Sequence, residues 1–200
     1  MEISVSIQPF FDEDSDILKD YIERIIKNGR YSIHFDYFYE NPGLLNFVGE
    51  FANRVSIHVH SLVDDVESFS KYRFKSVSVH AEGVMAGQTP IIKLNEIKRW
   101  TKGGLVFDLM TNDIERFRED IKLCDYCTVM TVAVGDSGRP FNKRGLTKIK
   151  QIKRINPKIK IIIDGGINDK TIKFIKKYPV DMIVVGSFAK KDFDGLKKLV

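Results

Sequence analysis

The feature that most constrains this chain is a regular alternation of two patterns along its whole length. Short runs rich in β-branched apolar residues, typical of buried strands, alternate with stretches whose apolar residues recur at helical spacing. In residues 14–27, for example, Leu18, Ile22 and Ile25 fall on one helical face. We expect strands at residues 3–7, 31–36, 55–59, 76–80, 104–107, 127–132, 159–163 and 182–185. We expect helices at residues 14–27, 42–53, 64–72, 90–102, 112–122, 143–155, 168–177 and 192–199.

Eight strand–helix units in 200 residues, about 25 residues each, predict an α/β fold, a single (β/α)8 TIM barrel over residues 1–200. The alternative is a doubly wound open sheet, which typically has about five or six strands and a glycine-rich turn after the first. This chain has more strand candidates and no GxGxxG after residues 3–7. No linker-like segment or internal repeat divides it, so the barrel is the preferred prediction.

The composition, 43% hydrophobic and 30% charged, indicates a globular protein with a sizeable core and excludes a disordered chain. The formal net charge is +5, but the basic residues are spread out beside acidic ones, so no nucleic acid partner is expected. No apolar run approaches the roughly 20 residues that a bilayer span needs. The N-terminal residues also lack the pattern of a secretory signal. We therefore expect a cytoplasmic protein with no membrane partner.

Cys124 and Cys127 form a single CxxC pair. A structural zinc site needs two further ligands at suitable spacing, and none follow. A thioredoxin-like pair opens a helix, whereas here a strand-like apolar run continues from the pair. Packing in the core is therefore the preferred interpretation.

Polar side chains follow the ends of several expected strands. His34 and Asp36 share one face of the second strand, because strand side chains alternate with a period of two. His60 and Asp164 end the third and seventh strands, and barrel strands present such ends to one mouth. Two imidazoles and two carboxylates suit a divalent ion, either Zn, Fe, Mn or Co. The alternative is that histidines here are structural, although all four fall at expected strand ends: His34, His58, His60 and His80.

Two glycine-containing turns follow the last two expected strands. Gly165-Gly166 precedes the helix expected at residues 168–177, and Gly186-Ser187 precedes the last helix. Glycine lets backbone N–H groups approach an anion, and barrels often bind phosphate after strands seven and eight. A phosphate site and a pair of merely tight turns both remain open at this point.

Several segments resemble, in order and across nearly the whole chain, motifs of the ribulose-phosphate 3-epimerase family of (β/α)8-barrel metalloenzymes. IHFDYF (33–38) resembles the family's HxDxMDG, and HSLVDDVE (60–67) resembles HLMVENPE. VHAEG (79–83) is similar to the family's HxE, and VMTVAVGDSGRPF (129–141) to VMTVNPGFGGQKF. IIIDGGI (161–167) and DMIVVGSFA (181–189) complete the match.

The resemblance implies a metal-dependent isomerase of carbohydrate metabolism. It implies that one divalent metal ion is held by His34, Asp36, His60 and Asp164, and that Asp36 and Asp164 double as the acid/base pair. It implies substrate contacts from the residues at the family's matching positions: Ser6, His60, Met130, Gly135, Gly138, Gly165, Gly166, Gly186 and Ser187. The implied partner is a sugar phosphate, inverted at C3 from D-ribulose 5-phosphate to D-xylulose 5-phosphate in the pentose phosphate pathway. Analogy with the family also implies a homo-oligomer.

Departures from the family's pattern lie where the substrate is covered. Phe38 and Leu62 replace two methionines, Ala133 and Val134 replace the loop's asparagine and proline, and Arg139 replaces glutamine. The exact sugar therefore stays open. A hexulose-6-phosphate 3-epimerase acting on allulose 6-phosphate is one alternative, and a barrel that binds sugar phosphate without catalysis is another. Barrels with aldol or decarboxylation chemistry are disfavoured because they lack this His/Asp set.

Four further positions receive looser expectations. His58, where the family has aspartate, is expected to support a metal ligand from behind, and His80 is expected to be structural or to lie just behind a ligand. Glu82 is expected to orient a ligand histidine. Arg139 is expected to reach the phosphate or a distal hydroxyl of the sugar.

Overall fold

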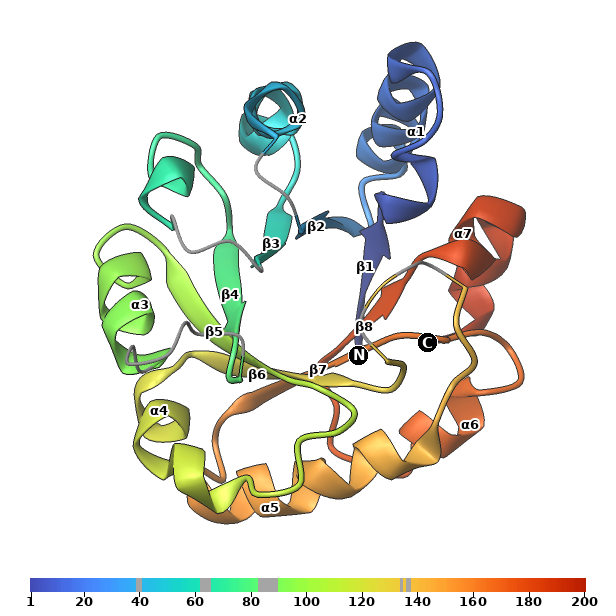
Figure 1. Cartoon of the computed structure of the whole chain (residues 1–200). Coiled ribbons are helices and arrows are strands. Elements are labelled where there is room, and N and C mark those ends of the chain that lie inside the picture. Colours follow the sequence, from blue (N-terminus) through green and yellow to red (C-terminus); the bar gives the residue numbers. More distant parts are fainter. Residues whose placement is uncertain (39–40, 62–65, 83–89, 134, 136–137) are drawn as a thin grey trace.

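In the computed structural model, eight parallel strands close into a barrel, each paired with its sequence neighbours and β1 paired with β8 (Figure 1). The structure describes residues 1–38, 41–61, 66–82, 90–133, 135 and 138–200. The strands are β1 (Glu2–Ser6), β2 (Ser32–Tyr37), β3 (Ile57–Ser61), β4 (Ser76–His80), β5 (Lys102–Phe107), β6 (Tyr126–Met130), β7 (Lys160–Asp164) and β8 (Met182–Val185). The predicted (β/α)8 barrel is confirmed, and the open sheet is excluded.

Helical segments surround the ring of strands (Figure 1). The α-helices are α1 (Ser15–Asn28), α2 (Pro42–Gly49), α3 (Pro90–Ile97), α4 (Arg118–Leu123), α5 (Lys148–Ile155), α6 (Ile172–Ile175) and α7 (Ser187–Lys191). Short 3-10 turns are η1 (Gln8–Phe10), η2 (Glu50–Asn53), η3 (Glu67–Phe69), η4 (Glu115–Phe117), η5 (Lys143–Thr147) and η6 (Asp194–Lys198). None of the described helices is long and apolar enough to cross a membrane.

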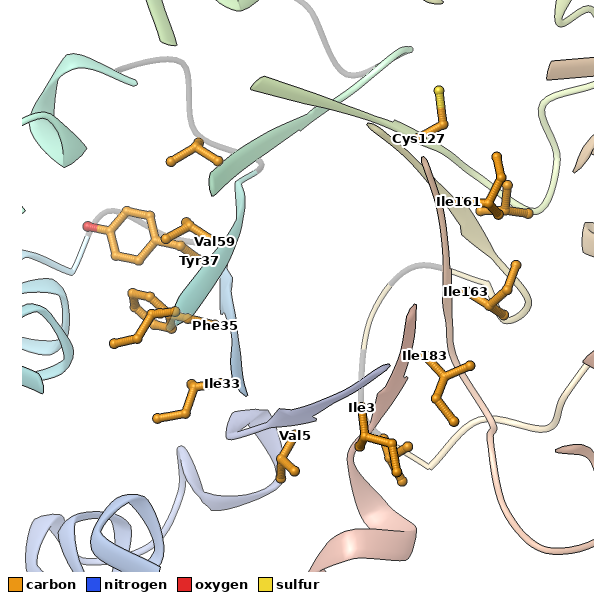
Figure 2. Close-up of a cluster of buried hydrophobic side chains, with 14 of the residues drawn as sticks. Ile3, Val5, Ile33, Phe35, Tyr37, Val59, Cys127, Ile161, Ile163 and Ile183 are labelled. Carbon is orange, nitrogen blue, oxygen red and sulfur yellow. The ribbon is translucent and has the colours of Figure 1, made fainter. Parts of the chain in front are cut away.

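The two faces of each strand have different roles. Odd-numbered residues of β2, such as Ile33 and Phe35, point away from the barrel axis and are buried beneath the helices (Figure 2). The even-numbered His34 and Asp36 point into the barrel, because alternate side chains leave a strand on opposite faces. On β2 apolar packing therefore occupies the outer face and polar side chains the inner face, whereas other strands also place apolar residues such as Ile162 and Val184 inside.

Local capping fixes where α1 begins and ends. The Asp14 carboxylate accepts a hydrogen bond from the Asp16 backbone N–H, which satisfies one free donor at the helix start. Gly29 ends the helix at φ +70°, a left-handed conformation that glycine adopts without a steric penalty. The helical period seen in residues 14–27 is thus confirmed.

Two helices expected near the C-terminus differ from the prediction. After β7, residues 168–171 form a hydrogen-bonded turn in which the Asn168 side chain accepts hydrogen bonds from the Lys170 and Thr171 N–H groups, and α6 occupies only residues 172–175 of the helix expected at 168–177. After β8, α7 occupies residues 187–191, and the expected helix at 192–199 is only the 3-10 turn η6.

Two earlier expectations also need correction. In the described part of residues 64–72 there is only the 3-10 turn η3, and residues 64 and 65 lie outside the described residues. The third strand begins at residue 57 rather than 55, because its pairing with β2 begins at Ile33 and Ile57.

Cys124 and Cys127 are both buried in the apolar core with their Sγ atoms 3.6 Å apart, as expected for core packing.

Candidate active site

Three strands bring the four predicted metal ligands together inside the barrel. His34 and Asp36 come from β2, His60 from β3 and Asp164 from the end of β7. One ligand atom from each lies within 4.8 Å of the others. His34 Nε2 lies 3.2 Å from Asp36 Oδ1 and 3.4 Å from Asp164 Oδ2. The convergence predicted from strand ends is therefore observed.

The donor set fits a divalent ion. His60 Nδ1 lies 3.2 Å from Asp36 Oδ1 and 3.8 Å from Asp164 Oδ2, yet it is buried and makes no hydrogen bond with any described residue. A buried polar atom without a partner is costly unless something else satisfies it. Two imidazole nitrogens and two carboxylates facing one point are ligands that first-row divalent metals accept.

Electrostatics inside this group are strongly coupled. Burial lowers the pKa of His34, but the charges of Asp36 and Asp164 outweigh burial and raise the pKa to about 9. Burial raises the pKa of Asp36, but the charge and hydrogen bond of His34 and the nearby His60 outweigh it and lower that pKa below its usual range. In the metal-free protein, Asp36 is therefore ionised beside a protonated His34.

Asp164 behaves in the opposite way. Burial raises the pKa of Asp164, His34 lowers it in part, and the charge of Asp36 raises it further, giving a value of about 7. Two carboxyl groups of one site thus favour different protonation states near neutral pH. Such a division is typical of acid/base pairs.

Ser6 fixes the orientation of one carboxylate. Its Oγ donates a hydrogen bond to Asp36 Oδ2 at 3.0 Å and accepts one from the Gln8 backbone N–H at 3.2 Å. The Asp36 Oδ1 atom is left facing His34 and His60.

A pocket opens next to the four ligands. All nine residues expected to contact substrate line it: Ser6, His60, Met130, Gly135, Gly138, Gly165, Gly166, Gly186 and Ser187. Asp36 and Asp164 line it too, as does Phe38, one of the two residues that replace the family's methionines. The other, Leu62, lies outside the described residues. The structure therefore gathers the candidate contacts around one cavity.

The Gly165-Gly166 turn requires glycine. Gly166 has φ +67°, and a Cβ there would lie 2.8 Å from the Phe141 backbone. The Thr131 hydroxyl contacts the carbonyl oxygens of Asp164 and Gly165 at 2.9 and 2.6 Å, which anchors the turn to β6. The sequence analysis missed Thr131, whose only signal is its place directly after β6.

The segment after β6 closes one side of the pocket. The Gln8 side chain donates a hydrogen bond to the Gly135 carbonyl at 3.2 Å, and the Arg139 guanidinium packs closely against Gly135. Arg139 is the only lysine or arginine among the described pocket residues. Val134 and residues 136–137 lie outside the described residues.

The histidines do not all lie on one rim. His34, His60 and His80 cluster, but His58 lies two residues earlier on β3, toward the amino end of the barrel, where its Nδ1 contacts Ser76 Oγ at 2.8 Å. Burial, and then the charges of His34 and nearby lysines, lower the pKa of His58 to about 4. His58 was expected to support a metal ligand, but the hydrogen-bond partner that the structure gives it is Ser76.

Of the two residues expected near a ligand histidine, His80 lies behind His60 as expected, whereas Glu82 does not. Glu82 Oε2 accepts a hydrogen bond from Thr111 Oγ1 at 2.9 Å, so its described partner is a threonine and not a ligand histidine. His80 takes the place behind His60, and Asp108 lies beyond His80. Sequence reasoning missed Asp108, although it directly follows β5 at the same mouth.

Fold and site together define a barrel enzyme with a buried His/Asp group at the carboxyl mouth of its strands. Residues 3–189 match the family described as "Ribulose-phosphate 3 epimerase family". The chain belongs to the ribulose-phosphate 3-epimerase family, whose members are isomerases.

Individual relatives agree with this assignment. The ribulose-phosphate 3-epimerase of Mycoplasma genitalium is 28% identical over 184 residues, 84% of each chain. That of Helicobacter pylori strain 26695 is 30% identical over 151 residues, 71% of this chain and 68% of the relative. A truncated 3-deoxy-D-arabino-heptulosonate 7-phosphate synthase from Thermotoga maritima superposes with a TM-score of 0.69 at 16% identity, covering 100% of this chain and 83% of that one. That last likeness shows the fold alone.

Proposed function

We propose that this protein inverts C3 of a ketose phosphate, converting D-ribulose 5-phosphate to D-xylulose 5-phosphate in a metal-dependent reaction. The observation that carries the proposal is the pair Asp36 and Asp164, two carboxyl groups that line one pocket and converge with the imidazoles of His34 and His60. Epimerisation beside a carbonyl needs a base that removes a proton from one face and an acid that returns one to the other.

Proton transfer would proceed between these two side chains. The ionised Asp36 takes the C3 proton, and the electrons of the C3–H bond move toward the carbonyl to give an enediolate. The protonated Asp164 then donates its proton to the other face of C3, and the same electron pair forms the new C–H bond. The two carboxyl groups exchange protonation states in each turnover, so the reverse reaction or exchange with solvent restores them.

The metal would be held by His34, Asp36, His60 and Asp164. A bound Zn²⁺, Fe²⁺, Mn²⁺ or Co²⁺ supplies positive charge that stabilises the negative charge developing on the sugar oxygens. Its absence would leave the enediolate charge facing two carboxyl groups, which is unfavourable.

The phosphate would bind in the same pocket, at the glycine-containing turns after β7 and β8. Support comes from the backbone of Gly165, Gly166, Gly186 and Ser187, which lines the pocket, and from the cationic Arg139 beside it. Backbone N–H groups with no intervening side chain and a guanidinium are suitable donors for a phosphate dianion. Phe38 would exclude water from the reacting carbon.

A hexulose 6-phosphate such as allulose 6-phosphate is the second candidate substrate. Arg139 and Ala133, which differ from the family's residues, both line the pocket and would contact the part of the sugar that distinguishes five from six carbons. Side-by-side kcat/KM measurements with the two ketose phosphates test this choice. A higher value for allulose 6-phosphate would replace the proposed substrate.

Proton exchange tests the proposed activity itself. Metal-loaded protein in D₂O should introduce deuterium at C3 of ribulose 5-phosphate and form xylulose 5-phosphate. Bound metal without exchange would instead support a barrel that binds sugar phosphate without catalysis.

The homo-oligomer expected from the resemblance stays a prediction, which light scattering on the purified protein checks.

A further inference from the structure

A chain of contacts leads away from the metal ligands behind His60. His60 Nε2 lies 2.5 Å from His80 Nε2, and His80 Nδ1 lies 2.6 Å from Asp108 Oδ1. The two imidazole ring planes are inclined by only 19° with their centroids 4.6 Å apart, which lets an N–H in the plane of one ring point at the other ring's nitrogen. His60 and His80 are 0% and 3% exposed, so these contacts are shielded from water.

The chemistry of the three groups fixes where their protons lie. A carboxylate only accepts hydrogen bonds, and the buried Asp108 Oδ1 has no hydrogen-bond partner among the other described groups, so its 2.6 Å contact with His80 Nδ1 calls for a proton on that nitrogen. A neutral histidine that binds a metal through Nδ1 carries its proton on Nε2, so in the 2.5 Å contact His60 Nε2 donates and His80 Nε2 accepts. His60 Nδ1 is then unprotonated. This atom faces Asp36 and Asp164, and within the described part of the chain it makes no hydrogen bond.

We propose that Asp108 and His80 are positioning residues that hold His60 in the one tautomer able to bind the metal through Nδ1. Asp108 sets the proton of His80, and His80 sets the proton of His60. The inference rests on the metal site of the proposed function, and it adds Asp108 and His80 as residues that support that site without binding the metal. Partners of this kind typically change metal affinity about 10–100-fold.

Glu82, a nearby carboxylate with a different hydrogen-bond partner, supplies a matched control for Asp108. Glu82, the carboxylate two residues after His80, accepts a hydrogen bond from Thr111 at 2.9 Å. Glu82→Gln keeps an acceptor for that hydroxyl and does not alter the Asp108–His80–His60 series. Its metal affinity should equal that of the wild type.

The first test reads the tautomer directly in the wild-type protein. The full chain is loaded with Zn²⁺, which is diamagnetic, and the histidine ¹⁵N resonances are assigned by NMR. We expect His80 to be neutral with its proton on Nδ1, and His60 to be protonated on Nε2. A His80 protonated on Nε2, or on both nitrogens, would overturn the inference whatever the variants do.

The second test measures Zn²⁺ affinity by competition with a chelator. Asp108→Asn keeps the size of the side chain but adds an N–H donor, which favours the other tautomer of His80, as in the related change in serine proteases. We expect its Zn²⁺ dissociation constant to rise about 10–100-fold, with His80 resonances changed. If folded Asp108→Asn binds Zn²⁺ as tightly as the wild type, only the positioning role of Asp108 and His80 is contradicted. If the wild type binds no Zn²⁺, the proposed metal site itself is contradicted. If Asp108→Asn does not fold, the wild-type tautomer decides the question.

Discussion

Asp36 and Asp164 contact the same nitrogen of one imidazole: His34 Nε2 lies 3.2 Å from the first carboxylate and 3.4 Å from the second. This sharing makes the three groups one electrostatic unit. It also explains the opposite pKa directions, because Asp36 has His60 as a further partner while Asp164 is left with the charge of Asp36 beside it.

The two aspartates should be individually indispensable for turnover. We expect Asp36→Asn and Asp164→Asn each to lower kcat about 10²–10⁴-fold, because one proton transfer then lacks its group. Steady-state assays, with urea unfolding as a check on the fold, measure this. An Asp164→Asn protein that keeps most of its activity would exclude the two-carboxylate scheme.

Metal binding should depend on pH through His34. Its pKa in the metal-free protein is raised to about 9, so His34 is protonated at pH 7 and must lose that proton to bind metal. Apparent Zn²⁺ affinity should therefore rise with pH between 7 and 9, about tenfold per unit for one proton released. Calorimetry at pH 8 in buffers of different ionisation enthalpy counts the protons. An affinity independent of pH over this range would contradict the raised pKa.

Arg139 should act on the phosphate and not on the chemical step. We expect Arg139→Gln to raise KM for the sugar phosphate about tenfold or more, since a charge-assisted hydrogen bond contributes about 1.5–3 kcal/mol, with little change in kcat. Arg144→Gln is the control, because Arg144 contacts Asn112 and does not line the pocket. Equal KM values for both variants would remove Arg139 from the phosphate site.

The Gly166 turn should be intolerant of a side chain. Gly166→Ala adds a Cβ 2.8 Å from the Phe141 backbone at φ +67°, whereas Gly29→Ala has a similar φ of +70° and open space around it. Positive φ costs about 1–2 kcal/mol in both, and overpacking adds about 1–3 kcal/mol only at Gly166. Urea unfolding should therefore show a larger loss of stability for Gly166→Ala. Equal losses of stability in the two variants would mean that the backbone near Gly166 and Phe141 shifts to make room for the Cβ at no further cost.

The sequence was sufficient to predict the barrel and half of the ligand group. Alternation of apolar runs with helical stretches predicts eight units, and period two places His34 and Asp36 on one face. Spacing alone did not choose between His58 and His60; the resemblance did. In the structure Asp36 pairs in register with His60, and His34 with His58, which puts His60 at the level of the pocket.

Other features depend on contacts that no local pattern encodes. Asp108 matters because β4 and β5 are neighbours, with His80 paired to Val106 two residues before it. The segment after β7 first makes a turn, in which the Asn168 side chain accepts hydrogen bonds from two nearby N–H groups, and α6 follows only at residue 172. Both depend on side-chain geometry that appears only after the chain has folded.

The most direct test of the account is anomalous diffraction from crystals of the Zn²⁺-loaded protein. We expect a single strong peak inside the barrel mouth, about 2.0–2.2 Å from one atom each of His34, Asp36, His60 and Asp164. A Zn²⁺ peak elsewhere, with no density among these four side chains, would contradict the account.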